Sequence, residues 1–143
     1  MSDFKRLQVW HKAHALSLNV DRVSARMRGS RYSSLRSQMF RAAMSIPANI
    51  AEGRRQNSEK DFSRFLGYAL GSNSDLEHHL IVARDTKVIA ETDFVALLSQ
   101  TITVRKMLYG LLKRLVTSDS DSSGKTPKKR PLPTAGPPTA PGR

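Results

Sequence analysis

Apolar residues recur at intervals of three and four through the first 116 residues, and this spacing restricts the fold more than any other feature. Residues at these intervals form one apolar stripe along a helix, whereas a half-buried strand alternates at every second residue. Alternation of that kind is scarce here, and Pro47 is the only proline in this stretch. The spacing therefore predicts an all-α protein.

The stripes divide into four helical segments that are joined by short connections. They cover residues 7–27, 35–53, 58–83 and 91–115. Gly53 is the expected end of the second segment, and Ser58 with Asp61 is typical of a capping box at the start of the third. The expected core stripe of the fourth begins with Val95 and Leu98. Short connections between helices of about 20 residues favour antiparallel neighbours, so we expect an up-down-up-down four-helix bundle.

The composition changes at Thr117. Residues 117–143 contain six of the seven prolines, and Leu132 is their only large apolar residue. A segment with so little apolar surface cannot offset the entropy that it loses on ordering. We therefore expect residues 1–116 to form the four-helix bundle and residues 117–143 to be a disordered, basic tail rich in Pro and Ser.

Most of the positive charge belongs to the helical part of the chain. The formal net charge is +12, from 24 Lys and Arg against 12 Asp and Glu. The tail contains five basic and two acidic residues, a net +3, which leaves +9 for residues 1–116. An excess of this size favours an anionic partner, which is a nucleic acid, an anionic membrane surface or an acidic protein.

Ten basic residues between positions 22 and 64 are the candidate nucleic-acid contacts, and only three acidic residues accompany them. They are Arg22, Arg26, Arg28, Arg31, Arg36, Arg41, Arg54, Arg55, Lys60 and Arg64. Arginine is the better bidentate ligand for phosphate. The alternative is a solvated face that keeps the protein soluble, although surfaces of mixed sign achieve this without such an excess. No recognition-helix or RNP-like motif is present, so we expect no sequence-specific readout of RNA or DNA.

Pro47 interrupts the backbone hydrogen bonding of the second segment. The apolar stripe keeps the same face on both sides of this proline, which predicts a continuous, kinked helix. Asn49 and Glu52 are the candidate partners for the backbone group that Pro47 frees or for a neighbouring backbone group. A ligand site at the kink is the alternative, but no nucleophile–base pair accompanies it.

Gly67 and Gly71 lie inside the third segment, where each costs about 1 kcal/mol relative to alanine. A helix tolerates such residues where another backbone comes close. The partner is either the second helix of the same chain or another subunit, and both interpretations stay open at this point. Pro47, Asn49, Gly67 and Gly71 are therefore the candidate helix-packing or oligomer residues.

Several functional classes find no support in the sequence. The chain has no cysteine, which excludes disulfides and thiolate chemistry. Asp75 and His78 form a single Asp-x-x-His pair with no second copy, so we expect no di-metal site and name no metal ligand, with a single site at a pair of histidines as the alternative. Nucleotide-binding, metalloprotease and hydrolase motifs are missing, so we expect neither an enzyme nor a cofactor. No apolar run approaches the roughly 20 residues of a membrane span and no signal peptide is recognisable, which favours the cytoplasm and no membrane partner.

Residues 38–53, QMFRAAMSIPANIAEG, resemble the signature of a four-helix-bundle family encoded in intervening sequences of bacterial large-subunit ribosomal RNA genes. Three further segments agree with this family: Leu7-Gln8-Val9-Trp10, Ser58-Glu59-Lys60-Asp61-Phe62 and Ala69-Leu70-Gly71-Ser72. The resemblance covers residues 4–116 and does not extend to the tail. It implies a helical protomer, a ring-like homopentamer and no catalytic residues.

The same superfamily includes the accessory variability determinant of diversity-generating retroelements, a basic pentamer that binds a reverse transcriptase and RNA or DNA. The basic body and tail of this chain favour that role among family members. The resemblance therefore implies a non-enzymatic, nucleic-acid-binding accessory protein with a reverse transcriptase as partner. The alternative is a protein-interaction scaffold with the unassigned role of the ribosomal-RNA-gene proteins.

Overall fold

The computed structural model describes residues 3–123, and they form an all-α structure without any strand in that range. The four α-helices are α1 (Gln8–Ser24), α2 (Ser33–Arg54), α3 (Glu59–Asp85) and α4 (Glu91–Ser123). Two 3-10 helices, η1 (Phe4–Arg6) and η2 (Ser30–Tyr32), precede α1 and α2 respectively. The side chains of 118–123 are not described.

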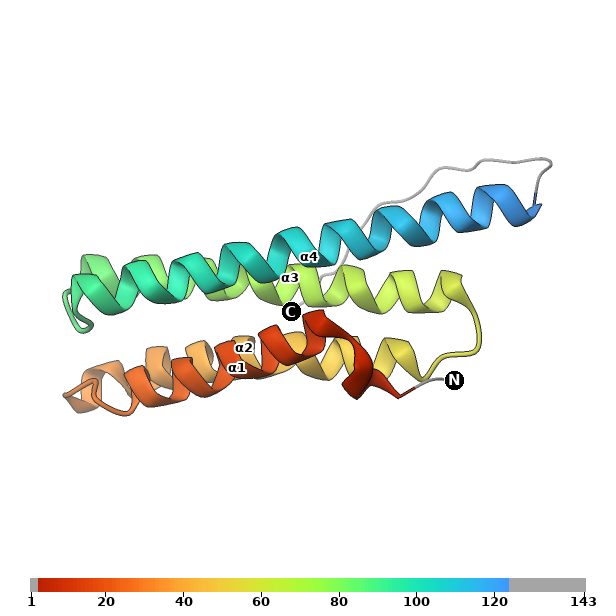
Figure 1. The fold of residues 1–143 in the computed structure, drawn as a ribbon. Helices are drawn as coiled ribbons and strands as arrows, with labels where there is room; N and C mark the ends of the chain where they lie inside the picture. The colour runs from red at the N-terminus through yellow and green to blue at the C-terminus, as the bar shows by residue number, and fades with distance from the viewer. Residues whose placement is uncertain (1–2, 124–143) are drawn as a thin grey trace.

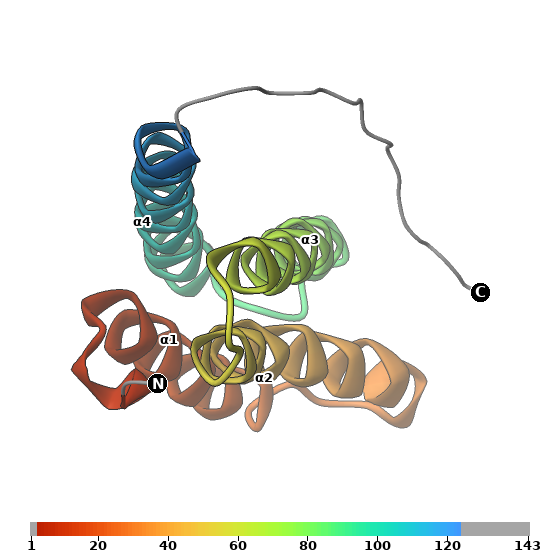
Figure 2. The ribbon, with the colours of Figure 1, turned by 90° about the vertical axis from the view of Figure 1, so that its right-hand side faces the viewer.

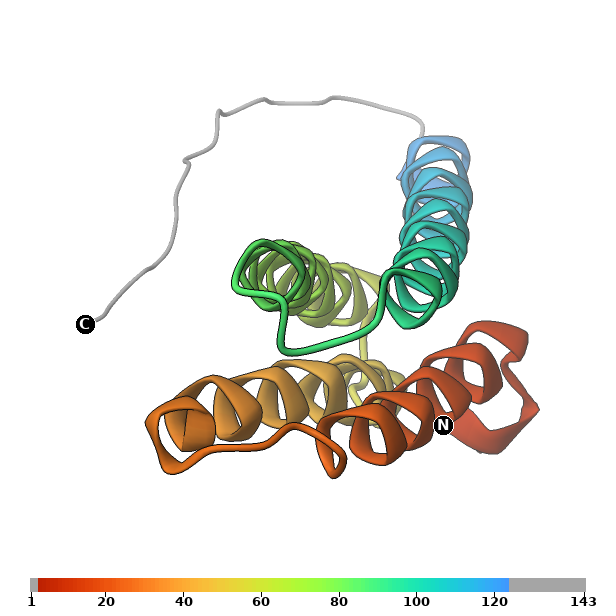
Figure 3. The ribbon, with the colours of Figure 1, turned by 90° about the vertical axis from the view of Figure 1, so that its left-hand side faces the viewer.

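Successive helices run in opposite directions and form two layers, with α1 and α2 in one layer and α3 and α4 in the other (Figure 1). The two end-on views place α3 above α2 and α4 above α1 (Figure 2 and Figure 3). Each helix packs against two others, since α1 contacts α2 and α4, and α3 contacts the same two helices. This arrangement confirms the predicted up-down-up-down four-helix bundle.

The core consists of the apolar stripes of all four helices. The largest fully buried apolar side chains are Leu16, Val20, Met39, Ile46, Ile50, Leu66, Leu76, Leu80, Leu97, Val104 and Leu108. The expected stripe of α4 was wrong at its start, because Val95 is 56% exposed while Phe94 and Leu97 are buried. Apolar residues occupy more than one face of α4, so their spacing alone does not select the inward face.

Pro47 lies inside α2, and Gly53 lies near its end. The helix runs unbroken through Pro47, as predicted, and Asn49 Nδ2 donates to the carbonyl of Ser45 at 2.8 Å, a neighbour of the group that Pro47 frees. Gly53 does not end the helix, which continues to Arg54. A Cβ at Gly53 would lie 2.8 Å from Cβ of Phe65, so this glycine permits the close approach of α2 to α3.

A buried polar network joins α3 to α4. Asn73 is fully buried and its Nδ2 donates to the carbonyl of Thr101 at 3.0 Å. Arg105 Nη1 donates to Asn73 Oδ1 at 3.2 Å and to Glu77 Oε1 at 2.6 Å. Because buried polar groups must keep their partners, this network sets the register of the two helices.

The helix α4 continues beyond the expected boundary at residue 116 and ends at Ser123. Its C-terminal end projects past the neighbouring helices in Figure 1. The first residues of the predicted tail are therefore helical. The rest of that prediction, residues 124–143, lies outside the described residues.

Candidate nucleic-acid interface

The structure divides the ten candidate basic residues between the two ends of the bundle. Five of them, Arg22, Arg26, Arg28, Arg31 and Arg36, lie where α1 is joined to α2, and we call them the α1–α2 arginine cluster. Arg54, Arg55, Lys60 and Arg64 lie where α2 is joined to α3, at the opposite end (Figure 1). Arg41 lies between them on α2, where it donates to Ser37. The 22 residues of α2 separate the ends by about 33 Å.

Within the α1–α2 arginine cluster, the side chains of Arg28 and Arg31 are the freest. Both residues are exposed, and neither forms an ion pair with any of residues 3–117, whose side chains the structure describes. The guanidinium of Arg31 stands 5.0 Å from the ring centroid of Tyr32. Gly29 turns the chain between these two arginines with a φ of 95°, a conformation that favours glycine.

The other three arginines of this cluster are anchored. Arg26 forms an ion pair with Asp93 of α4 at 2.9 Å. Arg36 Nη1 donates to the carbonyl of Met27 at 3.1 Å, which ties the first turns of α2 to the end of the α1 segment. Arg22 donates to the side chain of Asn19. These contacts hold the loop that presents Arg28 and Arg31.

The acidic residues at this end of the bundle come from α1, α3 and α4, and the loop and α2 add almost none. The sequence from Arg22 to Ala51 contains no acidic residue. The first turn of α2 contains none either, and its N-cap residue Tyr32 makes no side-chain capping hydrogen bond. The positive end of the α2 dipole and the negative end of the α1 dipole both lie at this loop, so the positive field there comes from the arginine side chains.

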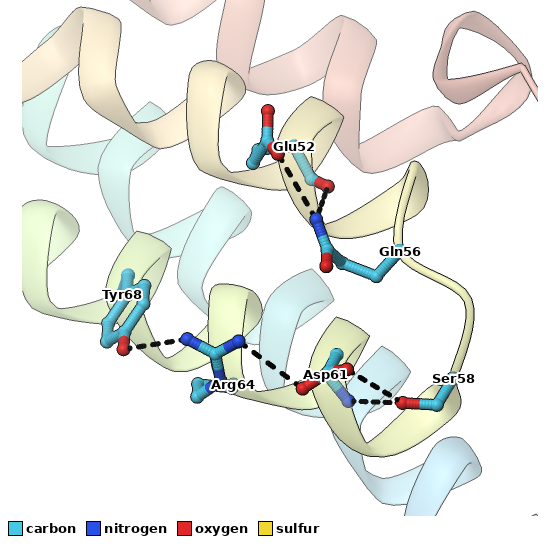
Figure 4. Close-up of polar contacts among 6 residues, drawn as sticks. All are labelled: Glu52, Gln56, Ser58, Asp61, Arg64 and Tyr68. Atoms are coloured by element: carbon cyan, nitrogen blue, oxygen red, sulfur yellow. Dashed lines mark hydrogen bonds and ion pairs between the residues drawn. The ribbon is translucent and has the colours of Figure 1, made fainter.

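The cluster at the α2–α3 end is more strongly neutralised. Arg64 lies between Tyr68 and Asp61, with distances of 3.2 Å to the phenol oxygen and 3.3 Å to the carboxylate (Figure 4). Hydrogen bonds with Tyr68, and then with Asp61, raise the pKa of Arg64. Arg55 lies 3.9 Å from the carboxylate of Glu52.

Arg54 and Lys60 complete this second cluster, and they differ in access. Arg54 is half-buried as the last residue of α2, and its guanidinium stands 5.6 Å from the ring centroid of Phe62. Lys60 is exposed in the first turn of α3, between Glu59 and Asp61. Two of the four basic residues at the α2–α3 end therefore form ion pairs with described carboxylates, against one of the five in the α1–α2 arginine cluster.

Gly67 and Gly71 lie on the exposed face of α3. A Cβ at either position would meet no described atom within 4 Å beyond its immediate helix surroundings. The interpretation that these glycines admit the second helix is therefore wrong. Tyr68, beside them, is 49% exposed.

The histidines of α3 belong to no cluster of potential metal ligands among the side chains that the structure describes. Residues 3–117 contain no group of three or more His, Asp or Glu side chains that could hold a metal ion. Burial, and to a smaller extent the neighbouring charge of His78, lowers the pKa of His79.

None of the helices among residues 3–123 is long and apolar enough to cross a membrane.

Sequence reasoning missed the partners that organise these basic residues. Asp93 is 67 positions from Arg26, and Glu77 is 28 positions from Arg105. No local spacing reveals such pairs, because only the packing of the helices brings them together.

The fold and its two basic ends define this protein as an all-α four-helix bundle with an excess of positive charge. The family model for the 23S rRNA-intervening sequence protein matches residues 5–110, and the chain belongs to this family. The predicted family resemblance is thereby confirmed. A comparison with curated proteins gave no match.

The fold is also similar to the crystal structure of a protein of unknown function from the S23 ribosomal protein family of Bacteroides thetaiotaomicron VPI-5482. The TM-score is 0.69 at 22% sequence identity, and the match covers 73% of this chain and 98% of the other. This likeness concerns the fold alone.

Proposed function

We propose that this protein is a non-enzymatic accessory protein that binds the phosphate backbone of RNA or DNA through the α1–α2 arginine cluster. The observation that carries the proposal is the pair Arg28 and Arg31, which are exposed and form no ion pair with a carboxylate among residues 3–117. Two arginines on a supported loop bind adjacent phosphates by bidentate hydrogen bonds. The family name, which refers to an intervening sequence of 23S rRNA, is consistent with an association with RNA.

The binding mode follows from the chemistry of these side chains. Guanidinium–phosphate contacts position a nucleic acid without reading its bases. Each contact releases condensed counterions, so affinity falls steeply as salt is added. We therefore expect similar affinity for unrelated sequences of equal length and strandedness.

The proposal includes a homo-oligomer. The open glycine face of α3, with Gly67, Gly71 and the exposed Tyr68, supports a contact with a second copy of this chain. The number of five subunits, and a reverse transcriptase as protein partner, rest on the family resemblance. A ring of five would carry +45 on residues 1–116, because each copy contributes +9.

The binding experiment uses fluorescence anisotropy with labelled RNA and DNA of unrelated sequences at low salt. The test variant is Arg28→Ala with Arg31→Ala. The matched control is Lys106→Ala with Arg114→Ala, which removes the same two charges from exposed positions of α4. Circular dichroism verifies that both variants keep the helical fold.

We expect the test variant to lose affinity for every sequence alike, while the control variant stays close to the unmodified protein. Equal losses in the two variants would show that only total charge matters, which would contradict the assignment of the loop. Absence of binding even at low salt would refute the proposed function.

A further inference from the structure

Four ring side chains gather where η1 meets the start of α1. The rings of Trp10 and His14 are stacked, with centroids 4.9 Å apart and planes at 7°. The ring centroids of Phe4 and Trp10 are 5.1 Å apart, and their planes are tilted by 59°. His11 meets Trp10 edge-on, with centroids 5.2 Å apart and planes at 78°. The proposed phosphate contacts do not use these rings.

The local sequence explains why the rings meet. Trp10 and His14 are four residues apart, so they project from the same face of α1. The carboxylate of Asp3 caps η1 by accepting from the amide of Lys5 at 3.0 Å. The ring Nε2 of His11 lies 2.6 Å from the carbonyl of Lys5, which ties η1 back onto α1.

The two stacked rings differ in their exposure. Trp10 is half-buried and packs against the hydrophobic core, whereas His14 is exposed. An imidazole that lies parallel to the indole and remains in water offers a second flat π surface. A cap whose only purpose was to cover Trp10 would gain more from an aliphatic side chain, because burial of apolar area would then be greater.

The charges around the rings are positive. Lys5 and Arg6 of η1 are exposed, and Asp3 is the only acidic residue in the first 20 positions. The η1 helix also contacts α2, toward the end of the bundle that carries Arg55 (Figure 1). Flat rings among basic side chains are the combination that single-stranded nucleic acids bind, since bases stack while phosphates pair with the charges.

The geometry points to a stacking platform, formed by His14 on Trp10, for an unpaired base of single-stranded RNA or DNA. Lys5 and Arg6 of η1, which is tied back onto this part of α1, pair with the neighbouring phosphates. The inference rests on the proposed function and adds to it a preference for single strands. A duplex offers the same phosphates but keeps its bases stacked inside, so it cannot use the platform.

Trp10 is the only tryptophan of the chain, so its fluorescence reports on this site directly. Oligo-uridylate, oligo-thymidylate and a duplex DNA serve as probes at one low salt concentration. We expect both single strands to quench Trp10 at the concentrations at which anisotropy shows binding. The duplex binds without quenching, and the comparison of the two single strands tells RNA preference from DNA preference.

Three substitutions at exposed histidines separate stacking from charge. His14→Ala removes the outer ring, and we expect it to weaken single-strand binding between about fivefold and a hundredfold while duplex binding is unchanged. His14→Phe keeps a flat ring without an imidazole, so we expect it to retain most of the affinity. His78→Ala removes an exposed imidazole from α3 and serves as the control.

Quenching of equal size by duplex and single strands, or unchanged single-strand affinity in His14→Ala, would overturn the inference. The proposed function survives that result if the salt-sensitive binding that depends on Arg28 and Arg31 remains. If no nucleic acid binds at low salt, the proposed function fails and the platform fails with it.

Discussion

Replacement of Gly53 by alanine tests how closely α2 and α3 pack near their connection. A Cβ at this position would lie 2.8 Å from Cβ of Phe65 and 2.9 Å from Cδ1 of Phe62. Carbon atoms pack best at about 3.5–4.0 Å, so the helices would have to separate by roughly 0.7–1.2 Å. The Cβ of Phe65 is bonded to the α3 backbone and cannot rotate away, so the helix itself must move.

The magnitude follows from two opposing terms. Overpacking of a close-packed core costs about 1–3 kcal/mol, and a clash with a backbone-linked atom falls in the upper part of this range. Alanine inside a helix is more favourable than glycine by about 1 kcal/mol. We therefore expect Gly53→Ala to lower the free energy of unfolding by about 1–2 kcal/mol.

Urea denaturation followed by far-ultraviolet circular dichroism measures this change, with Gly110→Ala in α4 as the matched control. A Cβ at Gly110 would meet no described atom within 4 Å beyond its immediate helix surroundings, so only the helix-propensity gain applies there. We expect Gly53→Ala to unfold at lower urea concentration than the unmodified protein, and Gly110→Ala at the same or a higher concentration. Equal stability of the two variants would refute the close packing at Gly53.

Three further predictions concern the network, a histidine and the subunit contact. Asn73→Ala leaves Arg105 without one of its hydrogen-bond partners, so it should lower the free energy of unfolding by about 1–3 kcal/mol. Urea denaturation measures this change, and an unchanged midpoint would contradict the network. Burial and then His78 lower the pKa of His79 from its ordinary 6.5. As the pH drops below about 6.5, the unfolded chain therefore binds a proton at His79 before the folded protein does, and the free energy of unfolding should fall. His79→Gln should flatten that fall, and an identical pH profile would exclude His79 as its source. Light scattering at micromolar concentration should find an oligomer that Gly71→Arg dissociates, and a monomeric unmodified protein would exclude the contact.

The fold was predictable from the sequence because its helices carry regular apolar stripes. The capping arrangement of Ser58 and Asp61 also appears as expected, since the hydroxyl of Ser58 accepts from the Asp61 amide at 3.1 Å. The inward face of α4 was not predictable, because Val95 and Phe94 are both apolar and the choice depends on packing. Glycine is common at helix ends, so the sequence favours that role for Gly53. Only the close approach of α3 shows that Gly53 is a packing residue inside α2.

The candidate site was predictable in composition but not in arrangement. The sequence shows that arginines crowd between positions 22 and 64, but it does not show that α2 separates them into two groups. Nor does it show that Arg26 is paired while Arg28 is free, because Asp93 comes from a distant helix. The stacking of His14 on Trp10 follows from a four-residue spacing, but the fold of η1 over α1 completes the cluster.

The salt dependence of RNA binding tests the central claim most directly. The logarithm of the affinity for a single-stranded RNA should fall linearly with the logarithm of the salt concentration, with a slope of about −0.7 for each phosphate contact. Removal of Arg28 and Arg31 should make this slope shallower by about 1.4, since two phosphate contacts are lost. The control pair Lys106 and Arg114 should leave the slope unchanged. A slope that is the same in both variants and in the unmodified protein would contradict phosphate binding by the α1–α2 arginine cluster.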